Sequence, residues 1–522
     1  ASDVYKRQVL YRGHVIVPCD GRTDTLVPHA KKLVRDGREY AIVPHSLEET
    51  KVLRNLGYNV PPPILQHYDW AGSKPFDAQR ITAAMVTMNS RSFILNGMGT
   101  GKTRAILFAY DYLRQQGAAQ RLLVCAPLST LHQTWKREVI TVFPHLTAQV
   151  LYGHSREKRL KALAEPADVY IINHDGVKVI LPELLARGDI DMLCLDELTK
   201  YKEPKTDIWK VTNQLARKAR VVVGMTGSPV PNGPTDAYGQ VKLVNPPAMK
   251  FSFRQFRDHT MTKITEFKYI PKKDSTEKVF ALMQPAVRFT RDDCYDLPPC
   301  QTITVPAPLT QEQEKMYREM ARECAAMVAS GSIKAVNEAD RLNKLVQIAL
   351  GTVYTIDHRA HELDATPRLE ALADAIEQSN SKTIVFMPYK SSLERVAKYL
   401  SSRWSTAVVS GDVGAGQRDQ IFTSFNFSQD PHVIVAHPAC MSHGLTLTAA
   451  STIVWYGPPP SLEIYEQANA RITRPGQKYS QLIVNLAGTR VEERVYQRLN
   501  SRAELQGLLL EMFQRQELEA IL

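Results

Sequence analysis

Short, continuous apolar runs alternate with helical patterns along most of this chain. Runs that are apolar throughout, rather than at every second position, are typical of parallel strands buried on both faces. The first series of such runs is Ser92–Leu95, Leu122–Ala126, Val169–Ile172, Met192–Leu195 and Val221–Gly224. The second series is Thr383–Met387, Ala407–Ser410, Val433–Ala436 and Thr452–Trp455. The pattern predicts an α/β protein with two doubly wound parallel-sheet domains.

Other segments depart from this pattern and indicate further domains. The start of the chain combines strand-like runs at Val15–Val17 and Tyr40–Val43 with a helix over Ser46–Leu56, where Ser46 and Glu49 have capping-box spacing. Residues 1–8 fit no element. After residue 245 the alternation is lost, and residues 310–350 are helical. We therefore expect a small mixed N-terminal domain at 1–72, α/β domains at 73–245 and 366–500, a linker with a helical insertion at 246–365 and a C-terminal helix at 501–522.

The composition is that of a globular protein with excess positive charge. Of 522 residues, 44% are hydrophobic and 23% charged, and the formal net charge is +11. This balance favours a polyanionic partner such as a phosphate backbone, with plain solubility as the alternative. No apolar run approaches the roughly 18 residues of a membrane span, and no signal peptide is visible, so we expect no membrane partner. Seven cysteines without a Cys-x-x-Cys pair argue against zinc modules and disulfides, and predict a reducing, cytoplasmic setting.

A glycine-rich loop after the first buried strand is the strongest chemical signal. Such a loop, placed between a strand and a helix, wraps backbone N–H groups around the phosphates of ATP. We expect Lys102 to reach the β- and γ-phosphates and the Thr103 hydroxyl to bind Mg²⁺. Asn96 replaces the first glycine of the strict pattern, and a chance glycine loop is the alternative interpretation. The residues of the predicted phosphate site are Gly97, Gly99, Thr100, Gly101, Lys102 and Thr103.

Two acidic residues follow the apolar strand Met192–Leu195. Asp196, at the carboxyl end of that strand, is placed to hold Mg²⁺, and Glu197 to orient and deprotonate the attacking water. Adjacent acids after a strand are often only surface residues. The phosphate loop upstream favours the catalytic interpretation, because ligands bind at the carboxyl edge of parallel sheets.

A third motif, Gln467–Gln477, lies in the second α/β region. We expect it to begin on a helix, with Arg471 and Arg474 on the same face as Gln467 because they follow it by four and seven residues. Arginines supplied from a second domain can neutralise the charge of the departing γ-phosphate. A solvated basic helix is the alternative. We assign Lys102, Glu197, Gln467, Arg471 and Arg474 to catalysis.

In this order the motifs resemble those of helicase superfamily 2, specifically its Swi/Snf-like branch. The resemblance extends from about Phe76 to Phe513 and implies two tandem RecA-like domains. The sequence departs from the family at Thr199, where a histidine is usual, and at Ala470, where aspartate or glycine is more common. The compact size resembles phage-encoded or bacterial members.

The resemblance also implies residue roles around the nucleotide site. Gln79 is similar to the glutamine that reads adenine, and Gly444 lies in a motif that touches both nucleotide and nucleic acid. Lys390 and His443 are further candidates for nucleic-acid contact, with solvated surface residues as the alternative. The contacts that the family motifs imply are Pro127, Ser129, Trp135, Thr226 and Ser228.

We expect a monomeric ATP-dependent translocase that uses Mg²⁺ and moves on duplex or forked DNA in replication, recombination or repair. Single-stranded nucleic acid is a further candidate partner. A strand-separating DNA or RNA helicase shares every motif and is the first alternative. A nucleotide-gated binding protein with little turnover is the second alternative, against which Glu197, Arg471 and Arg474 argue.

Overall fold

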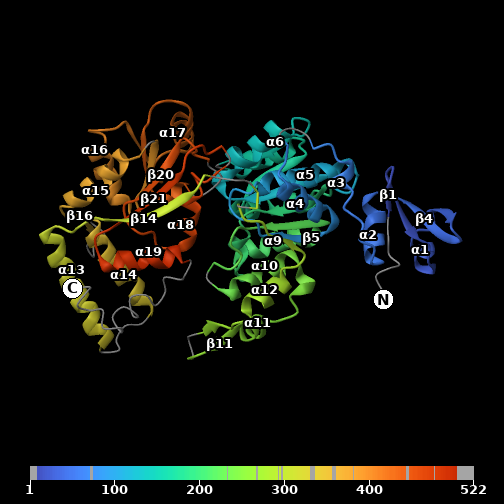
Figure 1. Cartoon of the computed structure of the whole chain (residues 1–522), viewed down its shortest axis with the longest axis horizontal. Helices are drawn as coiled ribbons and strands as arrows, with labels where there is room; N and C mark the ends of the chain where they lie inside the picture. Colours follow the sequence, from blue (N-terminus) through green and yellow to red (C-terminus); the bar gives the residue numbers. More distant parts are fainter. Residues whose placement is uncertain are drawn as a thin grey trace. The chain divides into compact units, whose positions relative to one another are not determined.

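Residues 1–295 and 296–522 form two structural units in the computed structural model of the chain (Figure 1). The structure describes residues 9–70, 74–153, 155–231, 233–265, 269–291, 293–294, 298–329, 335–354, 360–379, 381–441, 446–474 and 476–501. Among these residues, no helix combines the length and apolar character needed to cross a membrane.

The chain begins with an antiparallel sheet of four strands in the order β1-β2-β4-β3. Val15, Val17, Ala41 and Val43 alternate onto one face of this sheet and form a small buried core. Ser46 takes the N-cap position of α2, but its side chain makes no capping hydrogen bond. The elements are β1 (Val9–Tyr11), β2 (His14–Pro18), α1 (Gly21–Leu26), β3 (Lys31–Arg35), β4 (Arg38–Pro44), α2 (Leu47–Asn55) and α3 (Ile64–His67).

The first α/β region is built on a parallel sheet of seven strands in the order β13-β5-β10-β9-β6-β8-β7. Its strands are β5 (Arg91–Ile94), β6 (Arg121–Ala126), β7 (Ala148–Val150), β8 (Val169–Asn173), β9 (Ile190–Leu195), β10 (Val221–Met225) and β13 (Ala286–Val287). Its helices are α4 (Asp77–Met88), α5 (Lys102–Gln115), α6 (Arg137–Val142), α7 (Arg156–Ala164), α8 (Leu181–Ala186), α9 (Asp207–Lys218) and α10 (Ala237–Val244). Before β13 come α11 (Phe253–Thr260), the strand pair β11 (Met261–Lys263) and β12 (Tyr269–Pro271), and α12 (Ser275–Leu282).

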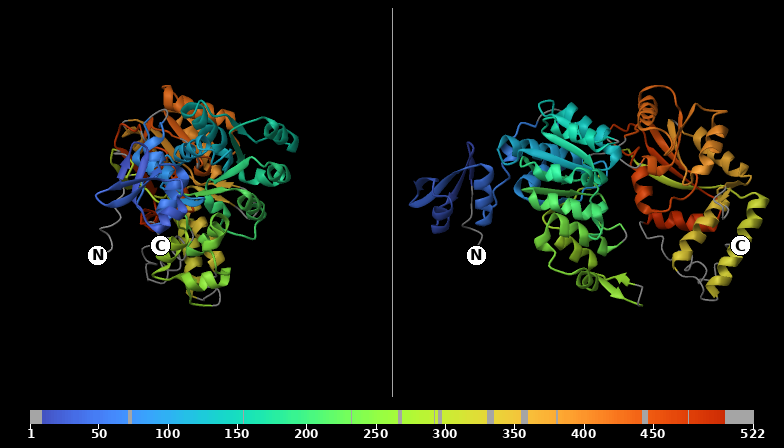
Figure 2. Two further views of the ribbon diagram at one scale, coloured as in Figure 1. Left: turned by 90° about the vertical axis from the view of Figure 1, so that its right-hand side faces the viewer. Right: turned by 180° about the vertical axis from the view of Figure 1, so that it is seen from behind.

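Helices cover both faces of this sheet, which explains the continuous apolar runs (Figure 2). Along β6, Leu122 and Val124 face one core, whereas Leu123 and Cys125 face the other. Because successive side chains of a strand point to opposite faces, burial of both faces requires an apolar residue at every position. The predicted doubly wound arrangement is therefore confirmed for this region.

The second unit contains a parallel sheet of six strands in the order β14-β21-β20-β17-β19-β18. Two cores again lie on opposite faces of it. Its strands are β14 (Cys300–Pro306), β17 (Lys382–Phe386), β18 (Thr406–Val409), β19 (Val433–Ala436), β20 (Ala450–Trp455) and β21 (Gln481–Ala487). The other elements are α13 (Gln311–Ala329), α14 (Ala335–Ala349), the hairpin β15 (Thr352–Tyr354) and β16 (Ala360–Glu362), α15 (Thr366–Glu377), α16 (Leu393–Leu400), α17 (Ala415–Phe427), α18 (Leu462–Asn469) and α19 (Arg490–Asn500).

The domain boundaries differ from those expected. β13 and β14 both lie in the stretch 246–365 that was interpreted as linker and helical insertion, yet each is the edge strand of one parallel sheet. The predicted boundaries at 245 and 366 therefore cut across both sheets. The helical stretch at 310–350 contains two helices, α13 and α14, and the expected C-terminal helix at 501–522 lies outside the described residues apart from residue 501.

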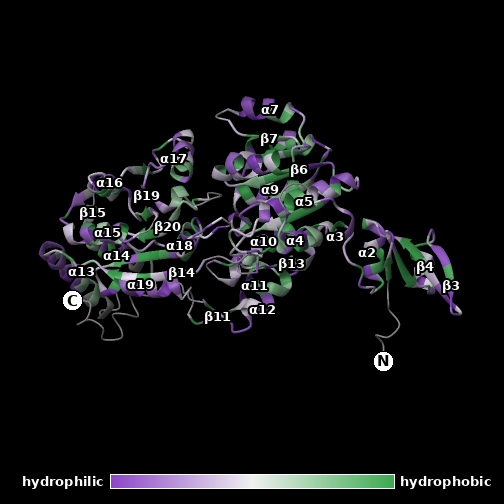
Figure 3. Cartoon of the chain, turned by 45° about the horizontal axis from the view of Figure 1, so that its top comes forward, coloured by the Kyte–Doolittle hydropathy of each residue, from purple (hydrophilic) through white to green (hydrophobic). Residues whose placement is uncertain are grey.

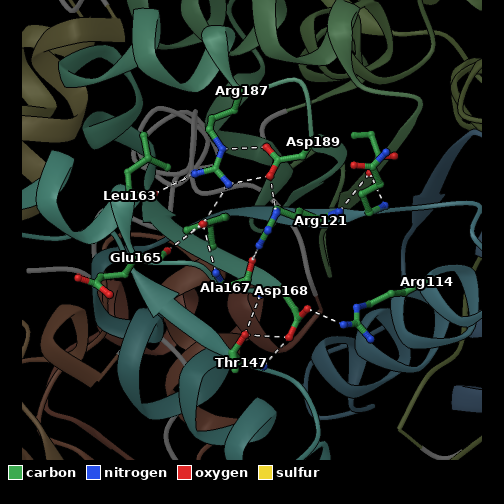
Figure 4. Close-up of polar contacts among 12 residues, drawn as sticks. Arg114, Arg121, Thr147, Leu163, Glu165, Ala167, Asp168, Arg187 and Asp189 are labelled. Atoms are coloured by element: carbon green, nitrogen blue, oxygen red, sulfur yellow. Dashed lines mark hydrogen bonds and ion pairs between the residues drawn. The ribbon is translucent and has the colours of Figure 1, made fainter.

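Polar contacts connect the amino ends of β6, β7, β8 and β9 in the first sheet (Figure 4). Arg187 donates to both carboxylate oxygens of Asp189, at 2.8 and 2.7 Å, and Arg121 forms an ion pair with the same carboxylate. Asp168 accepts the backbone N–H and hydroxyl of Thr147, each at 2.8 Å. The carboxylates of Asp168 and Asp189 at this edge therefore both have partners within the protein.

Candidate functional site

The glycine-rich loop connects β5 to α5 at the carboxyl edge of the first sheet. Gly99 and Gly101 have φ values of 82° and 77°, a left-handed conformation that glycine adopts without steric cost. Lys102, the first residue of α5, donates from Nζ to the carbonyl oxygens of Asn96 and Gly97 at 3.0 Å each. The lysine side chain therefore folds back over the loop. The loop leads directly into the N-terminus of α5, a helix of 14 residues.

Asn96 has a defined structural role where the strict pattern has glycine. Its buried side chain donates from Nδ2 to Thr82 Oγ1 at 3.0 Å and accepts the Phe289 N–H at 2.9 Å. The Gly97 N–H in turn donates to the Phe289 carbonyl at 2.8 Å. The start of the loop is thus held between α4 and the segment that follows β13. Glycine, which has no side chain, could not provide the two contacts of Asn96.

Gln79 reaches the same loop from α4. Its Oε1 accepts the Phe76 N–H at 3.0 Å, and its Nε2 contacts the Gly101 carbonyl at 3.3 Å. A Cβ atom on Gly101 would lie only 2.0 Å from that nitrogen, so a larger residue here would displace the Gln79 side chain. The structure places Gln79 against the phosphate loop, and its role in reading adenine stays a prediction.

The two acidic residues leave β9 at the same sheet edge as the loop. β10 alone separates β9 from β5, so the two motifs start about 10 Å apart across the strands. Glu197 has φ 52° and ψ 61°, a left-handed conformation that costs a non-glycine residue about 1–2 kcal/mol. Strain of this kind is concentrated at functional sites, where the surrounding structure holds the side chain in place.

Both carboxylate oxygens of Asp196 accept a hydrogen bond. The Glu197 N–H donates to Oδ1 at 3.1 Å, and the indole N–H of Trp135 donates to Oδ2 at 2.9 Å. These donors hold the carboxylate in one orientation beside the loop. The oxygen groups of Asp196 and Thr103 follow strands that end at the same sheet edge, and they are of the ligand types that Mg²⁺ takes alongside substrate phosphates.

Trp135 differs from its predicted role as a nucleic-acid contact. Its side chain is fully buried, because the π-helical turn Leu131–Lys136 points it into the core toward Asp196. A fully buried side chain cannot contact a nucleic-acid backbone at the protein surface, so this prediction is wrong for Trp135. The neighbouring Ser129 is exposed and Pro127 half-buried, and both stay candidates for that contact.

The segment after β10 lies directly beside the phosphate loop. The Thr226 N–H donates to the Ile94 carbonyl of β5, and the buried Thr226 hydroxyl accepts the Ser228 N–H at 3.2 Å. A Cβ atom on Gly227 would lie 3.5 Å from the Met98 side chain. Thr226 and Ser228 are therefore adjacent to the nucleotide loop, while their contact with nucleic acid stays a prediction.

The arginine motif of the second unit has a different local structure from the one expected. α18 ends at Asn469, and the following turns include hydrogen bonds from the Arg471 N–H to the Ala468 carbonyl and from the Gln477 side chain to the Ile472 carbonyl. Pro475 further disfavours helical backbone at Arg474. Gln467 and the two arginines thus do not share one helical face.

Gln467 and Arg474 make hydrogen bonds to neighbouring residues of the same unit. Arg471 is buried, Arg474 donates from Nε to the Ala470 carbonyl at 3.0 Å, and the buried Gln467 donates to Glu463 at 3.0 Å. Lys390 is exposed after β17, with Nζ 3.5 Å from Asp412 Oδ1. His443 and Gly444 lie outside the described residues.

Comparison with known proteins identifies the domains. A model of the SNF2-related domain matches residues 79–351, and a model of the helicase conserved C-terminal domain matches residues 367–476. Protein p41 of Acyrthosiphon pisum secondary endosymbiont phage 1 is 27% identical over 451 residues, which are 81% of this chain and 95% of p41.

A curated relative and a solved structure are also similar to this chain. YwqA of Bacillus subtilis (strain 168), named as an ATP-dependent helicase/translocase, is 24% identical over 80% of this chain, which spans only 46% of YwqA. The Sulfolobus solfataricus SWI2/SNF2 ATPase core, solved in complex with dsDNA, aligns with 86% of this chain and 95% of its own at 20% identity and a TM-score of 0.39. Because the SNF2-related match alone covers more than half of the sequence, the chain belongs to the SNF2 family of ATP-dependent helicases and translocases.

Proposed function

We propose that this chain is a DNA-dependent ATPase that moves along duplex or forked DNA and acts in replication, recombination or repair. One observation carries the proposal: the glycine loop with Lys102 and the acids Asp196 and Glu197 follow strands that end at the same edge of one sheet, with a single strand between them. The net charge of +11 and the Swi/Snf-like form of the motifs favour duplex DNA as the polymer.

The chain's own groups account for the chemistry of hydrolysis. Lys102 exchanges the carbonyls of Asn96 and Gly97 for β- and γ-phosphate oxygens, and the loop N–H groups bind the remaining charge. Glu197 orients the attacking water and accepts its proton. Thr103 and Asp196 would hold Mg²⁺, which neutralises phosphate charge when it is bound. Arg471 and Arg474 supply the positive charge that the γ-phosphate needs as it leaves.

An ATPase assay with and without nucleic acid tests the proposal. We expect blunt duplex DNA to stimulate turnover, and Lys102→Ala to lower the stimulated rate about 100- to 1,000-fold, by analogy with the loss of one oxyanion donor. Lys161→Ala, which removes a lysine from the last turn of α7, is the matched control and should keep full turnover. Absence of stimulation by duplex DNA, or full activity of Lys102→Ala, would contradict the proposal.

The same assay separates the alternatives. Stimulation by RNA, or unwinding of a forked duplex, would favour a strand-separating helicase over a translocase. Retention of biological function by Glu197→Gln would favour a nucleotide-gated binding protein, because that variant keeps the shape of the side chain and loses the base.

A further inference from the structure

The N-terminal sheet has one covered face and one open face. The covered face packs against Leu53 of α2 and against Leu56, which follows that helix. Its buried residues are Val15, Val17, Ala41 and Val43. The pairing register places the alternate residues of the same strands on the opposite face, where no helix of this core packs. The open face consists of Val9, Tyr11, His14, Ile16, Pro18, Lys31, Leu33, Arg35, Arg38, Tyr40, Ile42 and Pro44.

Aromatic and aliphatic side chains of this face reach the solvent. Tyr11 is 56% exposed, Val9 55% and Leu33 40%, while Tyr40 and Ile42 are half-buried between strands. Figure 3 shows hydrophobic colouring on the inner strands and hydrophilic colouring on β3 at the edge. Contiguous apolar surface rimmed by polar residues is typical of a binding site.

The charges of the open face have one sign. Lys31, Arg35 and Arg38 stand on the β3–β4 side, and none of the face positions within the described sheet is an aspartate or glutamate. Glu39, by contrast, pairs with Val34 and therefore points to the covered side. Asp36, in the turn between β3 and β4, forms an exposed ion pair with Arg35, with 3.8 Å between Arg35 Nε and the carboxylate. The face positions themselves carry three cations and no acid, which is complementary to phosphate groups.

The aromatic residues favour a single strand over a duplex. Tyr11 and Tyr40 are two strand spacings apart and four residues apart along the strands, which is about 10 Å by 13 Å on the sheet surface. The Arg12 guanidinium lies over one face of the Tyr11 ring, 5.2 Å from its centroid, and Tyr40 is half-buried. Bases of a single strand can stack on the other face of Tyr11 and on the accessible part of Tyr40, whereas the bases of a duplex are already stacked on one another. The distance accommodates a few nucleotides whose backbone runs past the cations.

We infer that this open face is a second nucleic-acid site, which binds single-stranded DNA through stacking on Tyr11 and Tyr40 and through Lys31, Arg35 and Arg38. The site lies before residue 79, where the SNF2-related match begins, and it uses no residue of the nucleotide site. It would give the protein affinity for the unpaired strand of a DNA junction.

Binding of a fluorescent oligo(dT) of about 12 nucleotides to the full chain without ATP tests the inference. We expect Tyr11→Ala to weaken binding about tenfold. Tyr479→Ala is the control, because Tyr479 is 57% exposed in the second unit and does not belong to this face. The double variant Arg35→Ala/Arg38→Ala should weaken binding and reduce the salt slope by about 1.4, the value for two lost phosphate contacts on a single strand.

A second control removes two cations of the same domain away from this face. Arg22→Ala/Lys51→Ala removes one cation from α1 and one from α2, so the net charge falls as much as in Arg35→Ala/Arg38→Ala. This control should keep both the affinity and the salt slope. Equal losses in this control and in Arg35→Ala/Arg38→Ala would overturn the inference, since they would reflect net charge alone. Unchanged oligo(dT) affinity in Tyr11→Ala would also overturn it.

Turnover on blunt duplex DNA separates this inference from the proposed function. The Tyr11 and Arg35/Arg38 variants should keep duplex-stimulated ATPase activity, because the motor residues are intact. An equal loss of duplex affinity would overturn the assignment to a single strand. If the wild-type chain binds oligo(dT) through these residues but lacks duplex-stimulated turnover, the inference stands and the proposed function fails.

Discussion

The two parallel sheets share one architecture but distribute their charged residues differently. In the first, β5 is followed by a glycine loop that opens onto α5, and β9 ends in two acids. In the second, β14 pairs with the last strand, β21, as β5 pairs with β10 in the first. β14 is followed by residues 307–310, which contain no glycine, before α13 begins. The second sheet therefore has no glycine-rich phosphate loop at the corresponding strand.

The interiors differ as well. In the second unit, Arg368 and Glu492 form an ion pair whose side chains are 1% and 0% exposed, with Arg368 Nη2 2.9 Å from each carboxylate oxygen. The first unit keeps its Arg187–Asp189 pair at a sheet edge, about a quarter exposed. One type of fold thus carries a glycine-rich loop in the first unit and a buried ion pair in the second, and the function of each unit depends on such residues rather than on the fold.

The largest expected effect tests whether the second unit takes part in hydrolysis. If Arg471 neutralises the transition state, Arg471→Ala should lower turnover at least about 1,000-fold while the affinity for nucleotide changes little. Steady-state kinetics and nucleotide binding measure the two quantities. Arg471 is buried, so Arg471→Lys and a thermal melt should accompany the variant. Arg403→Ala, at a distant surface of the same unit, serves as control, and equal turnover in both variants would contradict a catalytic role.

Glu492→Gln tests the buried ion pair between Arg368 and Glu492. Removal of one charge leaves Arg368 buried and unpaired, which costs about 3–5 kcal/mol. Urea unfolding should show this loss in the free energy of unfolding of the second unit. Glu493→Gln is the matched neighbour, because its pair with Arg490 is exposed and should contribute less than about 1 kcal/mol. Similar losses in both variants would show that the two pairs are equivalent.

Trp135→Phe tests the hydrogen bond that orients Asp196. The substitution keeps an aromatic ring in the core and removes one donor to a carboxylate, an interaction that contributes about 1.5–3 kcal/mol. We expect about tenfold lower turnover and a higher Mg²⁺ concentration for half-maximal activity. Trp209→Phe also removes a buried indole N–H, which donates to the Gly239 carbonyl at 2.9 Å, and should leave the Mg²⁺ dependence unchanged. A shift in both variants would indicate a general packing effect.

The smallest effect concerns pH. The hydrogen bond from Arg187 lowers the pKa of Asp189 to about 2. Because this pKa is below its ordinary value near 3.8, the stabilisation is present above about pH 4 and is lost as the pH falls toward 2. Asp189→Asn should therefore cost about 1 kcal/mol at neutral pH. The difference from wild type should shrink in melts below pH 4, whereas Asp207→Asn, at an exposed carboxylate, should show no such pattern.

The sequence predicted the elements whose signals are local. Val433–Ala436 was located to the residue, and the other predicted strands within one or two residues, because burial on both faces makes each position apolar. β7 and the buried strand β21 were not predicted. β13 has two residues, and β14 is an exposed edge strand, so neither carries such a signal. The phosphate loop and the acids were recognisable from their motifs. The contacts of Asn96 and Trp135 were not, since they depend on partners 193 and 61 residues away.

The anchoring of the phosphate loop to Phe289 has a mechanical consequence. The polypeptide runs on from Phe289 to Cys300, where β14 begins in the other sheet, so this connector starts at the loop itself. The hydrogen bonds of Phe289 to Asn96 and Gly97 therefore fix the residue from which this connector departs to the start of the phosphate loop.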